Sequence, residues 1–345
     1  MKININEIAK KAGVSIATVS RALNSSGSVK PETRRRIQEL AREYHYRPHP
    51  FARGLSKRKT DTIGVILPEL NDEFFMDIIH GVDEEAYRAN KYVMISSSHS
   101  RRDIIETLVE FMGSGRVDGM ILMVPQLQNE VAELIRNSKR PVVLMNISRN
   151  IENVVSFNID NYQGAFTIVE HLIQKHGYKN IGMILGPEGN WDAAERYRGF
   201  RDALAQYSIP LKENLIVQGS FTAQSGYYGF GRLMSQKEKP EAIFAANDMM
   251  AVGIYQAARE VNLSIPHDVA VVGFDDIYLS KLLTPRLTTM HVPIFELGSK
   301  AIRYLFKMIE DPETFKKPYR EDLTTGLMIG RSCGCDNNNS QHNFF

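Results

Sequence analysis

The chain has 345 residues, of which 43% are hydrophobic and 24% are charged, as in an ordinary globular protein. This length exceeds what one hydrophobic core usually organises, so two or three domains are expected. The sequence has no apolar run of about 18 residues and no apolar signal segment at its start. These absences predict a cytoplasmic protein with no membrane partner.

The formal net charge of +2 conceals an asymmetry between two parts of the chain. Residues 1–60 contain 14 Lys and Arg but only 4 Asp and Glu, a net charge of +10, whereas the remainder has a net charge of −8. A basic head on an acidic body is typical of a nucleic-acid-binding module that is attached to a second domain.

The beginning of this basic head predicts a first short helix that ends in a turn. Four apolar residues have the spacing of one buried helical face: Ile5, Ile8, Ala9 and Ala12. Asn4 and Glu7 have the spacing of a capping box at the start of this helix, and Gly13 supplies the turn after it.

A second helix over 15–23 follows, with Ser15 as its cap and with Val19 and Leu23 facing inward. Two helices joined by a tight turn form the unit that places its second helix in the major groove of DNA. The residues expected to face DNA are Ser15, Ile16, Ala17, Thr18, Ser20, Arg21 and Asn24. A helical hairpin without a DNA-binding role is the alternative, and the surrounding positive charge disfavours it.

A third helix is predicted over 31–46, since Pro31 suits a first helical position. Its inward residues are Ile37, Leu40, Ala41 and Tyr44. Arg34 on the same helix is expected to contact DNA phosphates. Residues 48–60 form a basic linker in which Pro50 can start a helix of about two turns, but Gly54 weakens it, so this helix is expected to form only when it packs against a partner.

From Thr62 onward, buried strands alternate with helices. The predicted strands are 63–67, 92–95, 119–124, 141–145, 155–159, 181–185, 215–217, 242–246 and 269–274, and the predicted helices are 74–89, 101–113, 127–137, 161–175, 192–206, 222–235 and 248–261. This alternation predicts an α/β fold with two doubly wound parallel sheets, each covered by helices on both faces. Ligands of such folds bind beyond the carboxyl ends of the strands, and therefore between the two sheets.

Polar and aromatic residues gather at these strand ends. They are Phe74, Phe75, Asn146, Asn247, Asp248, Asp275 and Asp276, and Arg196 and Phe221 add a guanidinium and a ring. Carboxylate, amide and guanidinium groups beside aromatic rings suit a small polyhydroxyl compound such as a sugar. The alternative for Asn247–Asp248 and Asp275–Asp276 is a local role as caps of the segments that follow them.

Catalytic and metal-binding signatures are missing from the sequence. It has no phosphate-binding loop, zinc-protease motif or serine elbow, and the glycines of 226–231 have the wrong spacing for a dinucleotide site. Asp275 and Asp276 are adjacent and therefore diverge, which disfavours a glycosidase pair. Cys333 and Cys335 lack two further ligands for a structural zinc and are expected to be reduced. We therefore expect no enzyme activity, no cofactor and no metal.

The order of motifs along the chain resembles the lactose repressor and galactose repressor (LacI/GalR) family of bacterial transcription regulators over almost the whole length. The matching segments are Val14–Asn24, Tyr46–Pro48, Ala52–Leu55, Thr62–Ile66, Arg196–Phe200, Ala246–Asp248, Val272–Asp276 and Pro285–Thr289. The resemblance implies a homodimer and a core like that of periplasmic sugar-binding proteins, in which the chain crosses between two subdomains near Asp160, His291 and Leu323.

The same resemblance implies the domain limits. A helix-turn-helix domain spans 1–47, a hinge helix and linker span 48–60, and an effector-binding and dimerisation core spans 61–335. Within this core, one subdomain comprises about 61–160 and 292–322, and the other comprises about 161–291 and 323–335. The polar tail, 336–345, lacks the leucine heptads with which the lactose repressor forms tetramers, so a dimer is expected.

The resemblance also implies roles for individual residues. Ile16, Ala17 and Arg21 would lie in the major groove, while paired hinge helices with Ala52 and Arg53 would insert Leu55 into the minor groove. The implied effector contacts are Phe74, Phe75, Arg196, Phe221, Asn247 and Asp275. Asn146 joins this expected effector site, although many members of the family have an aspartate there.

Together these features predict a ligand-controlled regulator, most simply a repressor, that binds a palindromic operator in double-stranded DNA as a homodimer and responds to a small carbohydrate-like effector. Two alternatives are a sugar-active enzyme with a regulatory DNA-binding head and a transport-type binding protein. Turnover of a bound sugar would support the first, and the missing signal segment disfavours the second.

Overall fold

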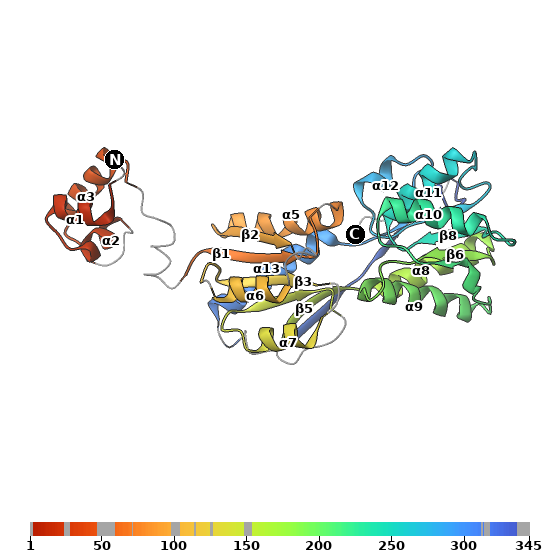
Figure 1. The fold of residues 1–345 in the computed structure, drawn as a ribbon, viewed down its shortest axis with the longest axis horizontal. Coiled ribbons are helices and arrows are strands. Elements are labelled where there is room, and N and C mark those ends of the chain that lie inside the picture. Colours follow the sequence, from red (N-terminus) through yellow and green to blue (C-terminus); the bar gives the residue numbers. More distant parts are fainter. Residues whose placement is uncertain are drawn as a thin grey trace.

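The structure is a computed structural model that describes residues 3–23, 28–46, 59–70, 72–97, 104–113, 115–124, 127–147, 154–311, 313 and 318–336. The predicted DNA contacts Asn24, Ala52, Arg53 and Leu55, and the short helix expected from Pro50, lie outside these residues. Figure 1 shows a helical head and two α/β subdomains. None of the described helices is both long enough and apolar enough to cross a lipid bilayer.

The head consists of α1 (Ile5–Ala12), α2 (Ile16–Leu23) and α3 (Pro31–Glu43). The predicted capping box is present, because Asn4 Oδ1 accepts a hydrogen bond from the Glu7 amide and Glu7 Oε2 accepts one from the Asn4 amide. Gly13 ends α1 at φ 64°, a conformation that favours glycine. The buried core residues of the head are Ile8, Ala9, Ala12, Val19, Ala22 and Ile37.

The third helix is shorter than the predicted range of 31–46. It ends at Glu43, and His45 adopts a positive φ of 49° that is incompatible with continuing the helix. Tyr44 is therefore 37% exposed, instead of lying fully in the inward face.

The first subdomain begins as a regular series of strands and helices. The elements are β1 (Thr62–Leu67), α5 (Glu73–Arg88), β2 (Tyr92–Ser97), α6 (Ile104–Gly113), β3 (Gly119–Met123), α7 (Asn129–Arg136), β4 (Val142–Met145) and β5 (Val155–Ile159). The sheet order is β11-β5-β4-β3-β1-β2, in which β11 (Tyr319–Leu323) comes from the C-terminal part of the chain, and the paired strands are parallel.

Consecutive residues of β1 are buried on opposite faces of this sheet. Ile63 and Val65 join the core cluster that includes α5, whereas Ile66 packs with residues of α6 and α7. Because successive side chains of a strand point to opposite faces, a strand covered on both sides is apolar throughout, as the sequence of β1 is.

The second subdomain repeats the pattern. Its elements are α8 (Asn161–His176), β6 (Ile181–Ile184), α9 (Trp191–Gln206), a 3-10 turn (Glu213–Leu215), β7 (Ile216–Val217), α10 (Ala223–Met234), β8 (Ala242–Ala245), α11 (Asp248–Glu260) and β9 (Ala270–Val272). The sheet order is β7-β6-β8-β9, again with parallel pairs. The predicted fold class, a helical head with two doubly wound parallel sheets, is confirmed.

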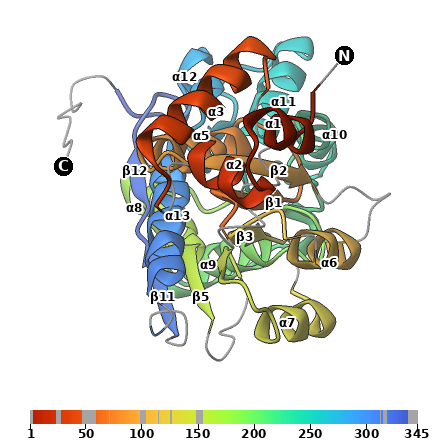
Figure 2. The ribbon, with the colours of Figure 1, turned by 90° about the vertical axis from the view of Figure 1, so that its left-hand side faces the viewer.

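Five C-terminal elements were not predicted from the sequence pattern: α12 (Tyr278–Leu282), β10 (Thr289–His291), α13 (Ile294–Glu310), β11 (Tyr319–Leu323) and β12 (Gly326–Met328). Of these, α13 packs along α5. β11 pairs with β5 in the first sheet, and Figure 2 shows these two strands side by side. β10 and β12 pair with each other between the subdomains. The chain thus passes between the subdomains after β5, after β10 and after β11.

The packing of α13 on α5 leaves no space for a Cβ atom at Gly298. A Cβ placed there would lie 2.3 Å from the carbonyl oxygen of Ile78. We expect Gly298→Ala to destabilise the core by about 1–3 kcal/mol, because backbone atoms must move. Gly231→Ala on α10 is the control, because nothing lies within 4 Å of that position and alanine favours a helix. Thermal unfolding of both variants measures this difference, and an unchanged midpoint for Gly298→Ala would contradict the packing argument.

Candidate functional site

The second helix of the head exposes the face that was predicted to contact DNA. Val19 and Ala22 of α2 are buried, while Ile16 is 49% exposed and Ala17 and Arg21 are also exposed. Ser15 Oγ accepts a hydrogen bond from the Thr18 amide at 3.2 Å, so the predicted cap is present. Thr18 and Ser20 are half-buried on the same helix. The arrangement presents short side chains and one long cation on a single surface.

The basic residues of α3 have different environments. Arg36 donates a hydrogen bond to the carbonyl oxygen of Ala12, at the end of α1, and therefore stabilises the packing of the head. Arg35 pairs with Glu39 at 3.0 Å, and both side chains are well exposed. Arg34 lies half-buried near the start of α3.

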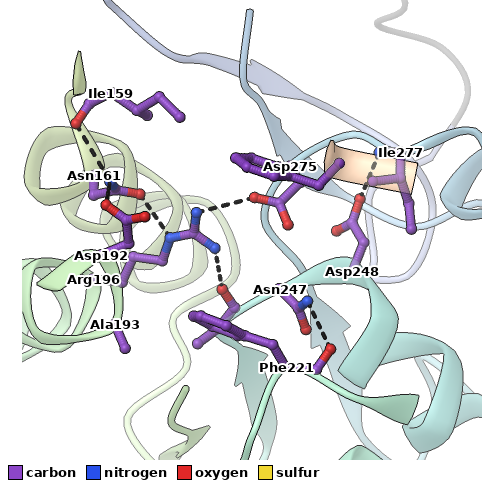
Figure 3. Close-up of polar contacts among 12 residues, drawn as sticks. Ile159, Asn161, Asp192, Ala193, Arg196, Phe221, Asn247, Asp248, Asp275 and Ile277 are labelled. Atoms are coloured by element: carbon purple, nitrogen blue, oxygen red, sulfur yellow. Dashed lines mark hydrogen bonds and ion pairs between the residues drawn. The ribbon is translucent and has the colours of Figure 1, made fainter. Parts of the chain in front are cut away.

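At the junction of the two subdomains, the guanidinium of Arg196 is the centre of a buried polar network (Figure 3). Arg196 extends from α9, and its side chain donates three hydrogen bonds to separate segments of the chain. Nε donates to Asn161 Oδ1 at 2.7 Å, Nη1 to the carbonyl oxygen of Ala246 at 2.5 Å, and Nη2 to Asp275 Oδ1 at 3.0 Å. A guanidinium carries five N–H donors, and these bonds use three of them.

Two aromatic rings flank this guanidinium. Its central carbon lies 3.9 Å from the ring centre of Phe274 and 5.6 Å from that of Phe221. Phe221 has a positive φ of 62°, and a Cβ at Gly186 would lie only 2.3 Å from its ring. Glycine at 186 is therefore what allows the ring to occupy this place. A cation between aromatic faces is stabilised by their quadrupoles.

Asp275 is the acidic partner of Arg196 and is itself 5% exposed. Burial raises the pKa of Asp275 to about 7; Arg196 opposes this shift, and the carboxylate of Asp72 adds to it. Because Asp72 caps α5 of the first subdomain, this interaction crosses the junction. Asp275 has a φ of 118°, a conformation that is rare outside glycine and marks a strained, specifically held residue.

Two residues that the sequence analysis did not select, Asp192 and Asn161, complete the network. Asp192 at the start of α9 accepts hydrogen bonds from Asn161 Nδ2 at 2.9 Å and from Asn146 Nδ2 at 3.3 Å. Burial raises the pKa of Asp192 to about 6. Because Asn146 follows β4 and Asp192 belongs to α9, the second of these bonds joins the two subdomains. Neither residue has a local sequence signal, because both act through contacts distant in the chain.

The capping role considered for Asn247 is present. Its Oδ1 accepts from the Met250 amide at the start of α11, while its Nδ2 donates to the carbonyl oxygen of Phe221. Asp248 is fully buried, and it accepts from the Thr289 hydroxyl at 2.6 Å and from the Ile277 amide at 3.1 Å. These two residues therefore hold together the segments that carry the predicted effector residues.

The remaining predicted residues lie around this network. Phe74 and Phe75 are largely buried at the start of α5, with their rings 5.4 Å apart and edge to face. Asp276 turns away from Asp275 and contacts His291 Nδ1 at 3.0 Å and Lys281 Nζ at 3.8 Å. The structure thus brings Arg196, Phe221 and Asp275 into one group, with Asn146 connected to it through Asp192 and Asn161.

Comparison with known proteins matches both parts of this architecture. A family model described as bacterial regulatory proteins, lacI family, matches residues 4–49, and one described as a periplasmic binding protein-like domain matches residues 169–333. Catabolite control protein A of Priestia megaterium is 34% identical over 325 residues, which cover 93% of this chain and 98% of that protein.

Solved structures give the same result over the full length. The lac repressor dimer bound to operator and the anti-inducer ONPF has a TM-score of 0.83 and 25% identity, and the transcriptional regulator CelR in complex with cellobiose has a TM-score of 0.73 and 28% identity. Each match covers 96% of this chain and 99% of the other chain.

A helix-turn-helix head joined to a periplasmic-binding-protein-like core defines a DNA-binding transcription regulator with a ligand-binding domain. This chain belongs to the lacI family of bacterial regulatory proteins.

The hydrogen bond between Asn146 and Asp192 explains why an amide suits position 146. We expect Asn146→Asp to place two carboxylates together and to reduce stability at pH 8 by about 1–3 kcal/mol. This expected loss of stability is smaller at pH 5 than at pH 8. In the unfolded chain both carboxyl groups ionise near pH 4, whereas the folded pair is expected to keep one proton well above that pH. The variant therefore loses stability as the pH rises from 5 to 8.

Thermal unfolding of Asn146→Asp at pH 5 and pH 8 tests this expectation. The matched control is the exchanged pair, Asn146→Asp with Asp192→Asn, which keeps one amide and one carboxylate and is expected to recover part of the loss. An equal loss at both pH values, or no recovery in the exchanged pair, argues against a direct interaction.

Proposed function

We propose that this protein is a repressor that binds a palindromic operator as a homodimer and is controlled by a sugar or sugar derivative bound between its two subdomains. The observation that carries the effector part is the group formed by the buried side chains of Arg196 and Asp275 and the half-buried ring of Phe221. Sugar hydroxyls accept from a guanidinium and donate to a carboxylate, while the apolar face of a sugar ring packs on an aromatic side chain. The CelR complex with cellobiose supports the same class of ligand.

The proposed control acts through polar contacts that join the described parts of the two subdomains. Asn146 donates to Asp192, and the amide of Tyr278 donates to Glu73 at the start of α5. A ligand held by residues of both subdomains favours one relative orientation of the two sheets and thereby changes the population that can bind DNA. Only a difference in affinity between the two orientations can produce this effect.

The proposed DNA contact is made by the exposed face of α2. Ile16 and Ala17 are apolar and suit the methyl groups of thymine, whereas Arg21 can donate to base edges. In the described structure, the side chain of Arg21 is exposed, and its Nε donates to the carbonyl oxygen of Ala17 at 3.2 Å. Arg34 of α3 supplies phosphate binding in this proposal. The lac repressor structure, a dimer bound to operator, supports this mode of binding.

Asp275→Asn tests the effector site. We expect it to weaken sugar binding by about 2–4 kcal/mol, roughly 30- to 900-fold, because a charge-assisted bond to the ligand is lost. The probes are cellobiose, ribose and their phosphates, screened by thermal shift on the wild-type protein and then measured by calorimetry. Asp276→Asn is the matched control, since its carboxylate faces His291 instead of Arg196.

Operator affinity without sugar is expected to change little in Asp275→Asn, so the DNA-binding and effector-binding roles separate in one variant. Sugar affinity equal to that of the wild type in Asp275→Asn would remove this residue from the proposed site.

Two arginine substitutions in the head test how DNA is recognised. We expect Arg21→Ala to relax base preference at one position of each half-site, because its side chain contacts base edges. Arg34→Ala should weaken binding to all sequences alike and lower the salt dependence of affinity by roughly one unit of slope, because one phosphate contact is lost. Selection from random DNA measures the first effect, and titration at several salt concentrations measures the second. A preference profile in Arg21→Ala identical to that of the wild type would refute the base-reading role.

A further inference from the structure

The last described residues of the chain bring both cysteines beside two histidines of α8. His171, His176, Cys333 and Cys335 offer ligand atoms that all lie within 4.8 Å of one another. The expectation that the cysteines lack two further ligands was wrong, because His171 lies beside both thiols and His176 lies beside that of Cys335. In the sequence, His171 is 162 residues from Cys333 and 164 residues from Cys335. The two thiols are free, and the cluster is separate from the Arg196 network.

The spacing between the ligand atoms fits a tetrahedral ion. His171 Nε2 lies 3.5 Å from Cys333 Sγ and 3.6 Å from Cys335 Sγ, and His176 Nε2 lies 3.4 Å from Cys335 Sγ. A tetrahedral zinc site, with Zn–S of about 2.3 Å and Zn–N of about 2.0–2.1 Å, places nitrogen and sulfur ligands about 3.5 Å apart. The three nitrogen-to-sulfur distances match this value.

The local backbone positions each pair of ligands. His171 and His176 lie near the end of one helix with four residues between them, a spacing found for histidine pairs in zinc sites. Gly334 separates the cysteines at a φ of 101°, which favours glycine and turns both thiols toward the helix. A longer side chain at 334 would approach the ring of His176.

Neighbouring groups hold the ligands in place. The hydroxyl of Thr288 donates to Cys333 Sγ at 3.1 Å, and Tyr178 donates to the carbonyl oxygen of Cys333 while its ring stacks on His176. Hydrogen bonds of this kind orient metal ligands and tune their basicity. Cys333 is fully buried and the other three ligands are half-buried, so an ion there would be largely shielded from water.

We propose that His171, His176, Cys333 and Cys335 form a structural Zn²⁺ site that fastens the C-terminal segment to α8 of the second subdomain. A Cys₂His₂ set with all four positions filled by protein is the composition of a closed structural site and not of a catalytic one. Binding replaces the thiol protons, which are released, with two sulfur–zinc bonds, and the two thiolates neutralise the charge of the ion. The ion thus joins segments far apart in the sequence and stabilises the folded core.

The test measures metal content and metal spectroscopy of the full chain. Wild-type protein, incubated with Zn²⁺ under reducing conditions and desalted, is expected to retain close to one zinc per chain, and Cys335→Ser and His176→Gln less than about a tenth of that amount. His267→Gln is the matched control, because His267 is exposed and lies outside the cluster, and it should retain zinc like the wild type.

A second measurement needs no variant. Co²⁺ added to the wild type should produce the intense visible absorption of tetrahedral, thiolate-ligated cobalt, and Zn²⁺ should abolish it. Because the chain has only two cysteines and both belong to the cluster, Zn²⁺ should also slow the reaction of both thiols with a thiol reagent. Absence of the cobalt spectrum in the wild type, or wild-type zinc content in folded Cys335→Ser and His176→Gln, overturns the proposal.

Discussion

The buried charge of Arg196 constrains the arrangement of the whole subdomain junction. Removing a guanidinium from water costs several kcal/mol unless acceptors replace the lost hydration. Here the acceptors come from three places: the start of α8, the end of β8 and the segment after β9. Each of these segments must therefore reach the same point, and the positions of Asn161, Ala246 and Asp275 are coupled through one side chain.

The same point concentrates negative charge. Asp192, Asp248 and Asp275 are all buried, and burial raises the pKa of each, with Asp275 raising that of Asp248 further. One guanidinium cannot pair equally with three carboxylates. Buried carboxyl groups with shifted pKa values are frequent at ligand-binding sites. A ligand that supplies hydroxyl donors would relieve this imbalance, which connects the electrostatics of the junction with the proposed class of effector.

The path of the chain determines how the subdomains can move. Three segments connect them, and the antiparallel pair of β10 and β12 joins two of these segments. Such a connection allows rotation or sliding of one subdomain against the other and opposes their separation. The hydrogen bonds from Asn146 and from the amide of Tyr278 lie across this boundary, so a change of orientation would alter them.

Much of the architecture followed from local patterns in the sequence. The capping box of Asn4 and Glu7, the turn at Gly13 and the apolar strands of both sheets were predicted, because caps and periodic burial depend on residues close together in the chain. The family was also recognisable, since its motifs are short and occur in a fixed order. The gathering of Arg196, Phe221 and Asp275 could be anticipated because parallel strands end at the same edge of a sheet.

The tertiary structure decided the features that depend on contacts between distant segments. The edge strand β11 has the sequence Tyr-Arg-Glu-Asp-Leu, in which only Leu323 is buried, so it lacks the pattern of a core strand and exists because it pairs with β5. Asp192 became part of the site only through Asn146 and Asn161, and the two cysteines acquired histidine neighbours only when the C-terminal segment packed on α8. Short-range patterns determine which elements form, whereas the closing of long loops determines which side chains meet, and that closure leaves no periodic trace in the sequence.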